Sequence, residues 1–344
     1  MTLSHGAVLV TGGAGYIGAH TVKALADRGV QTVVFDDFSS GHIEAVQWGP
    51  FVRGDIRDSA ALEAVIENYG ITAVVHFAGL IEVARSIVRP DLFYDVNVTG
   101  TRVLLSAMDR CNVRRLVFSS SAAVYGQGGN LPTGSLIAED QPLRPLNPYG
   151  ETKLFGERMI AAYCKAFGFS AVALRYFNAA GSDRSGKIGE AHNPETHLIP
   201  LAIDAALGKR PPITLNGVDY ATPDGSCLRD YIHVTDLAAA HVAALELDQP
   251  DGAFSVFNVG AGVGHSVLEV VKAVGSALGR GVPHVIGPPR EGDPASLIAD
   301  PTLAKRHLGW EPHFSSLEQI VATASAWRRA PAYGTDGLTA ARTV

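Results

Sequence analysis

A glycine-rich segment near the start of the chain constrains the fold more than any other feature. The apolar run Ala7 to Val10 predicts a buried strand, and Gly12, Gly15 and Gly18 follow it at three-residue spacing. Glycines at this place allow a tight turn and the close approach of a pyrophosphate, and the last one lets the next helix pack on the strand. A helix expected at about 15–28 would point free N–H groups at the phosphates. The segment predicts a dinucleotide site, although glycines also mark ordinary turns.

The next apolar run ends in two acidic residues. Residues 31–35 predict a second strand, and Asp36 and Asp37 lie at its end. A carboxylate in this position can accept hydrogen bonds from the adenosine ribose hydroxyls. The 2′-phosphate of NADP would meet an anion with no arginine beside it. Asp36 therefore favours NAD as the cofactor.

Strand-like and helical patterns alternate through the first half of the chain. The apolar runs predict strands near 7–11, 31–35, 73–77, 114–119 and 171–175, with amphipathic segments between them. This order is typical of an α/β fold with a doubly wound parallel sheet, the Rossmann fold.

Glycine and proline become frequent after residue 178, which predicts a smaller, loop-rich α/β lobe for the substrate. We expect an NAD-binding domain at 1–178, joined by chain returns from the C-terminal half. The substrate lobe is expected mainly at 179–330, and a flexible tail at 331–344.

Composition excludes several classes of function. The chain has 344 residues with a net charge of −6 and only short, scattered groups of lysine and arginine, which gives no reason to expect nucleic acid as a partner. Cys111, Cys164 and Cys227 lie too far apart for a zinc motif or a paired disulfide framework. Apolar stretches fall short of the roughly 20 residues of a membrane helix, and Met1 is followed within a few residues by the first strand. We expect a cytoplasmic protein with reduced thiols, no metal and no membrane contact.

A tyrosine and a lysine four residues apart form the main catalytic candidate. If a helix begins near Tyr149, after the proline-rich segment 142–148, then Tyr149 and Lys153 lie on the same face. An ammonium group near a phenol lowers the phenol pKa, so the tyrosine can act as a base. Such a pair also occurs by chance on surface helices. When the pair follows a nucleotide-binding segment in the same chain, it indicates redox chemistry on a hydroxyl group of the substrate.

A run of three serines ends the strand that precedes this helix. A hydroxyl there could bind the substrate oxygen that loses its proton, and Ser121 is the candidate for that contact. The alternative is that these serines are only residues of a strand-end turn.

Nine sequence stretches together resemble the extended short-chain dehydrogenase/reductases and, among them, the UDP-glucose 4-epimerases. The resemblance covers nearly all of residues 6–325, and several stretches lie outside the cofactor motif. The matching stretches are VTGGAGYIGAHT (10–21), GDIRD (54–58), HFAGL (76–80), SSSAAVYG (119–126), NPYGETK (147–153), LRYFNAAG (174–181), LRDYIHVTDLA (228–238), FNVGAGVGHSV (257–267) and REGDPASLIAD (290–300).

The resemblance implies a site residue by residue. Tyr149 would be the base for the sugar 4-hydroxyl, Lys153 would tune it and hold the nicotinamide ribose, and Ser121 would bind the 4-oxygen. The implied NAD-binding residues are Gly12, Gly15, Tyr16, Ile17, Gly18, Asp36, Asp37, Asp55, Ile56, Phe77, Ala78, Gly79, Lys153 and Phe177. The implied substrate-binding residues are Ser121, Tyr149, Asn178, Arg229, Arg290, Asp293 and Leu297.

The activity implied by this resemblance is the interconversion of UDP-glucose and UDP-galactose. Hydride would pass from sugar C4 to bound NAD and return to the other face of a 4-keto sugar, so NAD is not consumed. The positive charge of Arg229 and Arg290 supports the UDP assignment independently, because arginine side chains bind diphosphate anions well. Either arginine alone could instead be a surface residue or part of a structural ion pair. The family also implies a homodimer.

Three positions depart from the family pattern. Ile81 stands where a lysine near the cofactor is common, and Asn216 stands where an aromatic residue near the uridine is usual. Leu297 replaces a bulky tyrosine that some relatives carry beside the sugar, which leaves room at the 2-position. We therefore hypothesise that UDP-N-acetylglucosamine and UDP-N-acetylgalactosamine also interconvert.

Other members of the fold family offer rival functions. An NDP-sugar 4,6-dehydratase carries a Thr-Asp-Glu run where this chain has Ser121, Ala122 and Ala123, so the acid and base for water elimination are missing here. A non-catalytic NAD-sensing protein would tend to lose the Tyr149 and Lys153 pair. An oxidative NDP-sugar dehydrogenase would release stoichiometric NADH.

Overall fold

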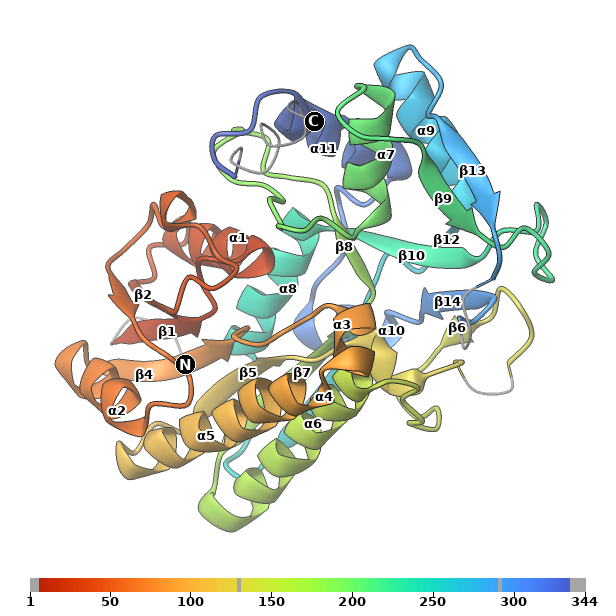
Figure 1. Ribbon diagram of the computed structural model, residues 1–344. Helices are drawn as coiled ribbons and strands as arrows, with labels where there is room; N and C mark the ends of the chain where they lie inside the picture. Colours follow the sequence, from red (N-terminus) through yellow and green to blue (C-terminus); the bar gives the residue numbers. More distant parts are fainter. Residues whose placement is uncertain (1–5, 129–130, 290–292, 335–344) are drawn as a thin grey trace.

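A seven-stranded parallel sheet organises the larger lobe of the protein (Figure 1). The computed structural model describes residues 6–128, 131–289 and 293–334. All residues of the first two strands are buried, as expected where helices cover both faces of a parallel sheet. In spatial order the strands are β11 (Phe254–Val259), β7 (Ser170–Tyr176), β5 (Arg115–Ser119), β4 (Ile71–His76), β1 (Ala7–Thr11), β2 (Thr32–Asp36) and β3 (Phe51–Arg53).

Helices pack on both faces of this sheet and bury two separate cores. One core lies under α1 (Tyr16–Ala26), α8 (Val234–Glu246) and α10 (Thr302–Leu308). The other lies under α2 (Ser59–Asn68), α5 (Gly100–Arg110) and α6 (Pro148–Phe167). Between β4 and α5 the chain forms α3 (Val83–Val88), α4 (Pro90–Phe93) and a π-helical turn (Tyr94–Thr99), which pack on α6.

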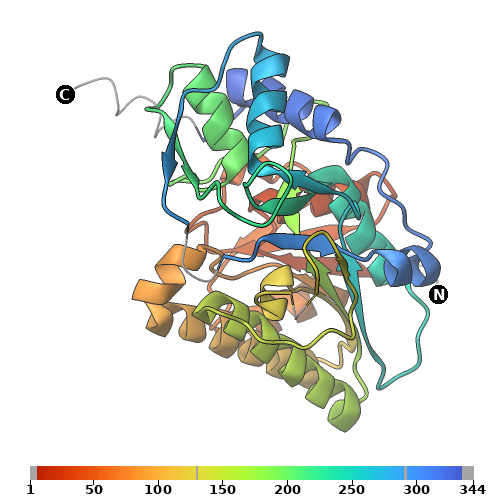
Figure 2. The ribbon, with the colours of Figure 1, turned by 90° about the vertical axis from the view of Figure 1, so that its right-hand side faces the viewer.

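A smaller lobe sits above the sheet in Figure 1. Its core lies among α7 (Leu198–Ala206), α9 (Val267–Leu278) and α11 (Leu317–Arg329). A parallel pair of strands, β9 (Ile213–Asn216) and β13 (His284–Gly287), borders these helices. The view in Figure 2 shows the two lobes stacked, with a second sheet between them. That sheet consists of β12 (Gly264–Ser266), β10 (Leu228–His233), β14 (Ser296–Ala299) and β6 (Leu136–Ile137), with β8 (Asn178–Ala180) paired to β10.

The doubly wound α/β fold predicted from the sequence is confirmed, with strand ends shifted by a few residues at most. The chain returns to the large sheet through β11 and α8, in the C-terminal half. The predicted division at residue 178 stays a prediction. Tyr333, at the start of the expected tail, is buried against Trp327, and residues 335–344 lie outside the described part.

Short 3₁₀ turns complete the described structure at Ile43–Ala45 and Ala122–Tyr125. Across the described ranges, none of the helices is long and apolar enough to span a membrane.

Candidate active site

The glycine segment forms a tight turn between β1 and α1. Gly12 has a φ of +72°, and a β-carbon there would meet the Ala78 nitrogen at 2.5 Å. A β-carbon on Gly18 would meet the Gly12 oxygen at 2.2 Å, so both positions require glycine. Gly15 is the N-cap residue of α1, and it has no side chain that could cap the first turn of the helix. The first N–H groups of the helix therefore keep their capacity to bind phosphate oxygens.

Asp36 lies at the carboxyl end of β2, beside this turn. Its carboxylate accepts hydrogen bonds from the Ala14 nitrogen at 3.0 Å and from the Phe38 nitrogen at 2.8 Å. Burial raises its pKa above the ordinary aspartate value, and the two backbone donors oppose that shift. The neighbouring Asp37 is exposed and accepts a hydrogen bond from Ser39. The two carboxylates thus border the glycine turn, where the sequence predicted ribose binding.

The other predicted cofactor residues line the same edge of the sheet. The backbone nitrogens of Phe77 and Ala78 both donate to the Thr11 oxygen, at 2.9 and 3.0 Å, which joins the ends of β4 and β1. Asp55 is paired with Arg57, whereas Ile56 is buried. The remaining predicted residues are Tyr16 and Phe177, both buried, and Ile17 and Gly79, both partly buried.

Helix α6 presents Tyr149 and Lys153 toward the end of β5. Asn147 caps the helix by accepting a hydrogen bond from the Gly150 nitrogen at 2.9 Å, and Pro148 fits its first turn. Lys153 Nζ donates to the Ser119 oxygen at 2.7 Å and lies 5.9 Å from the centroid of the Tyr149 ring. Burial lowers the pKa of Lys153 to about 8.

The pKa of Tyr149 differs in direction from the sequence prediction. Burial is the largest effect and raises this pKa, whereas a hydrogen bond with Ser121 lowers it. The predicted lowering by the Lys153 ammonium is not among the effects on this pKa, and the ammonium donates to the Ser119 carbonyl at 2.7 Å. The bound cofactor would add a positive nicotinamide ring beside the phenol, which lowers the phenol pKa further.

The three serines at the end of β5 point to different partners. Ser119 is hydrogen-bonded to the Tyr176 hydroxyl at 2.5 Å, and Ser120 donates to Glu157 at 2.5 Å. Ser121 alone among them bonds the Tyr149 hydroxyl, and its Oγ also accepts from the Ala123 nitrogen. Ser121 is therefore the serine that geometry brings to the phenol.

The structure brings four of the predicted substrate residues together in and beside the second sheet. Arg229 of β10 forms an ion pair with Asp293 and also donates to the Pro294 oxygen at 2.9 Å. Leu297 of β14 pairs in register with Arg229. Asn178 of β8 donates to the Asp230 oxygen at 2.9 Å, one residue further along β10. Arg290 lies outside the described residues.

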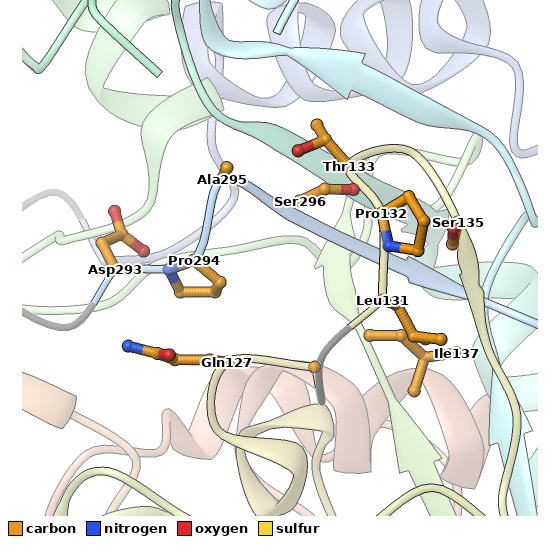
Figure 3. Close-up of a pocket in the computed structure, with 11 residues that line it drawn as sticks. Gln127, Leu131, Pro132, Thr133, Ser135, Ile137, Asp293, Pro294, Ala295 and Ser296 are labelled. Atoms are coloured by element: carbon orange, nitrogen blue, oxygen red, sulfur yellow. The ribbon is translucent and has the colours of Figure 1, made fainter. Parts of the chain in front are cut away.

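A pocket opens beside Asp293, between the segments 127–128 and 131–137 on one side and 293–296 on the other (Figure 3). Its side chains are a mixture of polar and apolar groups, among them Gln127, Leu131 and Thr133. None of its described lining residues is Tyr149 or Lys153, so this pocket adjoins the substrate lobe and is not the reaction centre.

The sequence prediction missed Asn97, which fixes one wall of the site. Its side chain accepts from the Leu80 nitrogen at 2.8 Å and donates to the Leu80 oxygen and to Thr152, both at 3.0 Å. A β-carbon on Gly79 would meet the Asn97 oxygen at 2.9 Å. Asparagine inside a helical stretch is unfavourable, which is the one local signal that could have identified this residue.

His76 links the end of β1, at the glycine turn, to helix α5. Its Nδ1 lies 2.7 Å from Thr11 Oγ1, and its Nε2 lies 3.0 Å from Thr101 Oγ1. Burial lowers its pKa to about 3, and the charge of Lys153 acts in the same direction. His76 therefore stays neutral and serves as a hydrogen-bonding link.

These observations fit a dinucleotide with a carboxylate-bound ribose. The glycine turn leaves no room for β-carbons, an uncapped helix start faces it, and two carboxylates border it. Lys153 and Tyr149 stand at the neighbouring strand ends, where a nicotinamide ring would lie at the crevice of a doubly wound sheet.

Comparison with known proteins agrees with this arrangement. Residues 8–260 match the model of the NAD dependent epimerase/dehydratase family. A UDP-glucose 4-epimerase from Halalkalibacterium halodurans is 47% identical over 328 residues, covering 95% of this chain and 97% of that protein. The crystal structure of UDP-glucose 4-epimerase from Brucella ovis in complex with NAD is 48% identical, with a TM-score of 0.89, and covers 93% of this chain and 98% of that one. The UDP-Glc/GlcNAc 4-epimerase from Campylobacter jejuni is 35% identical, with a TM-score of 0.81, and covers 94% and 99% of the two chains.

Proposed function

Because the chain belongs to the NAD dependent epimerase/dehydratase family, we propose that it is a UDP-glucose 4-epimerase, which interconverts UDP-glucose and UDP-galactose. The observation that carries the proposal is the convergence of Tyr149, Ser121 and Lys153 at the end of β5, next to the glycine turn. That arrangement supports the proposal because it combines a proton acceptor with the expected position of a nicotinamide cofactor that exchanges hydride with a sugar carbon.

Each of the three side chains has a defined task in this proposal. Tyr149 takes the proton of the sugar 4-hydroxyl, and Ser121 holds the same oxygen by a hydrogen bond. Lys153 supplies positive charge beside the phenol, which favours the phenolate form. NAD, which the glycine turn, Asp36 and Lys153 would hold, would supply reversible hydride exchange with C4 of the sugar. Proton and hydride both return to the sugar, so the reaction is redox-neutral.

The UDP moiety is anchored away from the reacting carbon. Arg229 lies on β10, Asn178 lies on the neighbouring β8, and Asp293 is ion-paired with Arg229. Arg290 belongs to the same proposed set. An arginine fork suits a diphosphate because it can donate two parallel hydrogen bonds. An anchor on the diphosphate leaves the sugar free to present either face to the cofactor, as inversion at C4 requires.

The range of sugars extends, in our proposal, to N-acetylated substrates. Leu297 is partly buried against the apolar cluster around Tyr125 and Phe177. Leucine is shorter than the tyrosine at this place in some relatives, so it leaves space for a group on C2. The similarity to the UDP-Glc/GlcNAc 4-epimerase from Campylobacter jejuni supports this extension.

We also expect a homodimer, as the family resemblance implies. Large apolar side chains are exposed on α3 and α6, with Ile87, Val88 and Phe155 exposed by 64%, 74% and 40%. Apolar patches of this kind mark protein interfaces. Light scattering on the purified protein measures the mass directly, and a monomer at micromolar concentration contradicts the expectation.

A 4,6-dehydratase is disfavoured by the turn that follows Ser121. Ala122 and Ala123 occupy a 3₁₀ turn there, where a dehydratase needs an acid and a base to eliminate water. Neither side chain can carry a proton.

The proposal is tested by incubating the purified protein with UDP-galactose and no added cofactor, and following the sugars by NMR. We expect an equilibrium mixture with UDP-glucose and no accumulation of reduced cofactor. A second arm with UDP-N-acetylgalactosamine tests the wider range. Absence of conversion of UDP-galactose, even after NAD is added, would contradict the epimerase proposal, whereas a dehydrated keto sugar would identify a dehydratase.

A further inference from the structure

Two histidines and two glutamates converge in the segment that leads from β8 to α7. We call Glu190, His192, Glu195 and His197 the His–Glu cluster. The cluster offers four ligand atoms, all within 4.8 Å of one another. None of these residues belongs to the proposed reaction centre. The cluster does border the glycine turn, because the His192 ring packs edge-on against Tyr16, with 6.0 Å between their centroids.

The spacing of the ligand atoms suits a tetrahedral metal ion. With metal–ligand bonds of about 2.1 Å, neighbouring ligands of a tetrahedral zinc site lie about 3.4 Å apart. His192 Nδ1 lies 3.2 Å from Glu190 Oε1 and 3.8 Å from Glu195 Oε1. His197 Nδ1 lies 3.8 Å from Glu195 Oε1 and also contacts Glu190 Oε1 closely. A tetrahedral ion would require His197 Nδ1 to move away from Glu190 Oε1.

Two polar atoms inside the cluster lack a hydrogen-bond partner among the described residues. One is Glu195 Oε2, on a side chain that is only 8% exposed. The other is His192 Nδ1, which lies at ion-pair distance from Glu190 Oε1 without forming a hydrogen bond to it. Glu195 Oε1 is already used, because it accepts from the nitrogens of Thr196 and His197 at 2.8 and 3.0 Å. A buried carboxylate oxygen without a partner is costly, and a bound cation satisfies it.

The backbone around the cluster is fixed by contacts with other elements. Trp327 of α11 donates from its indole nitrogen to the Glu190 oxygen at 2.7 Å. The oxygen of Ala191 lies 2.7 Å from the His42 ring nitrogen. The ligands therefore belong to a segment whose backbone is fixed by hydrogen bonds, which lowers the entropic cost of binding an ion.

We propose that the His–Glu cluster binds a divalent transition-metal ion of the zinc class. Two imidazoles with two carboxylates favour Zn²⁺ or Co²⁺ over Mg²⁺ and Ca²⁺, which prefer oxygen ligands alone. The ion would hold the segment 190–197 in contact with Tyr16 at the start of α1, and so stabilise the adjoining glycine turn. Sequence spacing of the cysteines could not reveal this site, because its ligands are histidine and glutamate.

Protons compete with a metal ion for the ligand atoms of the His–Glu cluster. In their presence the cluster is an ion-pair network: the two carboxylates raise the pKa of His192 to about 10, and the histidines lower that of Glu190 to about 2. The histidines and Glu190 then stabilise one another's charged forms. The experiment must therefore measure the metal itself and not the stability of the segment.

The test is a titration of the chelator-treated protein, with its native cofactor retained, with Co²⁺ alone. The proposal predicts one bound Co²⁺ per chain, a visible absorption spectrum of tetrahedral Co²⁺, and displacement by Zn²⁺. The absence of stoichiometric binding by the unaltered protein overturns the proposal and leaves the ion-pair network as the role of the cluster.

The Co²⁺ affinity of single-residue variants tests which side chains bind the ion. Glu195→Gln keeps an oxygen for the two backbone donors but removes the carboxylate, and we expect Co²⁺ affinity to fall about tenfold or more. His197→Ala alters a half-exposed side chain, so it serves if the first variant fails to fold. His284→Ala, an exposed histidine on β13, is the matched control and keeps full binding. Unchanged affinity in Glu195→Gln and His197→Ala, or a loss in His284→Ala, contradicts the assignment.

Discussion

Opposing influences set the protonation of Tyr149. Burial raises the pKa of its phenol, and the hydrogen bond with Ser121 lowers it. Lys153 stays within 5.9 Å of the ring, and burial lowers its own pKa to about 8. Near neutral pH the lysine therefore still carries most of its charge. The phenol becomes a usable base when that charge and the positive nicotinamide ring face it together.

Removal of one hydroxyl tests this role. In Tyr149→Phe we expect turnover of UDP-galactose to fall by about 10²–10⁴-fold, because the proton acceptor is lost while the apolar contacts remain. Retained NAD, measured after denaturation of the purified variant, should be unchanged.

The matched control lies on the same helix. Tyr163→Phe removes a hydroxyl that bonds only Ser106 at 3.0 Å among the described residues, far from the site. It should keep near-normal turnover. Equal activity of the two variants would remove Tyr149 from the mechanism.

Leu297 is the residue at which substrate range can be altered. Leu297→Tyr fills the space beside the sugar, so we expect the kcat/KM for UDP-N-acetylglucosamine to fall at least about tenfold, equivalent to about 1.4 kcal/mol. The kcat/KM for UDP-galactose should change much less. Leu297→Met conserves volume and should leave both values nearly unchanged. A parallel decrease for both sugars in Leu297→Tyr would argue against a pocket for the 2-substituent.

Helix α6 carries three functionally connected residues on one of its faces. Tyr149, Lys153 and Glu157 are four residues apart, so they project in the same direction. Glu157 forms a buried ion pair with Arg175 of β7, with nitrogen–oxygen distances of 2.9 and 2.7 Å. Ser120, next to Ser121, donates to the same carboxylate. The ion pair thus fixes the helix against both strands that border the reaction centre.

Breaking that pair from one side should be costly. We expect Arg175→Met to lower the free energy of unfolding by about 3–5 kcal/mol, because Glu157 is left buried without a counter-charge. The double variant Glu157→Leu/Arg175→Met should regain much of the loss, since it removes both charges. Chemical denaturation measures both values.

The control pair for this experiment lies on the surface. Arg28 and Glu246 form an ion pair with both side chains nearly half exposed, so Arg28→Met should cost less than about 1 kcal/mol. A loss in Arg175→Met as small as that of the control would show that the buried pair does not hold α6.

Buried neutral histidines shape the pH dependence of the whole molecule. Burial lowers the pKa of His20, His233 and His241 to about 4 and that of His76 to about 3. In each case the folded pKa lies below the unfolded value of about 6.5. The unfolded chain therefore binds protons first as the pH falls. Stability is present above pH 6.5 and declines toward pH 4.

His241 offers a single-site test of this dependence. Its Nδ1 lies 2.9 Å from the Leu237 oxygen, a contact that His241→Asn can keep without a titrating ring. Between pH 6.5 and 4.5 the unaltered protein should lose about 2 kcal/mol more stability than the variant. The free energy of unfolding at the two pH values measures the difference. Identical losses would show that His241 titrates normally in the folded state.

Local patterns predicted most of the fold and part of the site. The strand at 7–11, the glycine turn and the helix that carries Tyr149 depend on neighbours in sequence, so propensity and spacing were sufficient. Asn97 and His76 depend on partners 17 to 65 residues away, which only the packed chain brings together. The same holds for Lys153, whose carbonyl partner on Ser119 lies 34 residues earlier. The burial of Tyr149, which raises its pKa against the prediction, also depends on the packed chain.

The most direct test of the account follows the hydrogen on sugar C4. UDP-galactose labelled with deuterium at C4 is converted in ordinary water without added NAD, and the product is examined by NMR and mass spectrometry. We predict that UDP-glucose keeps the deuterium at C4, because hydride leaves and returns within one closed site. Loss of the label to solvent, or conversion that requires stoichiometric added NAD, would contradict the proposed epimerase mechanism.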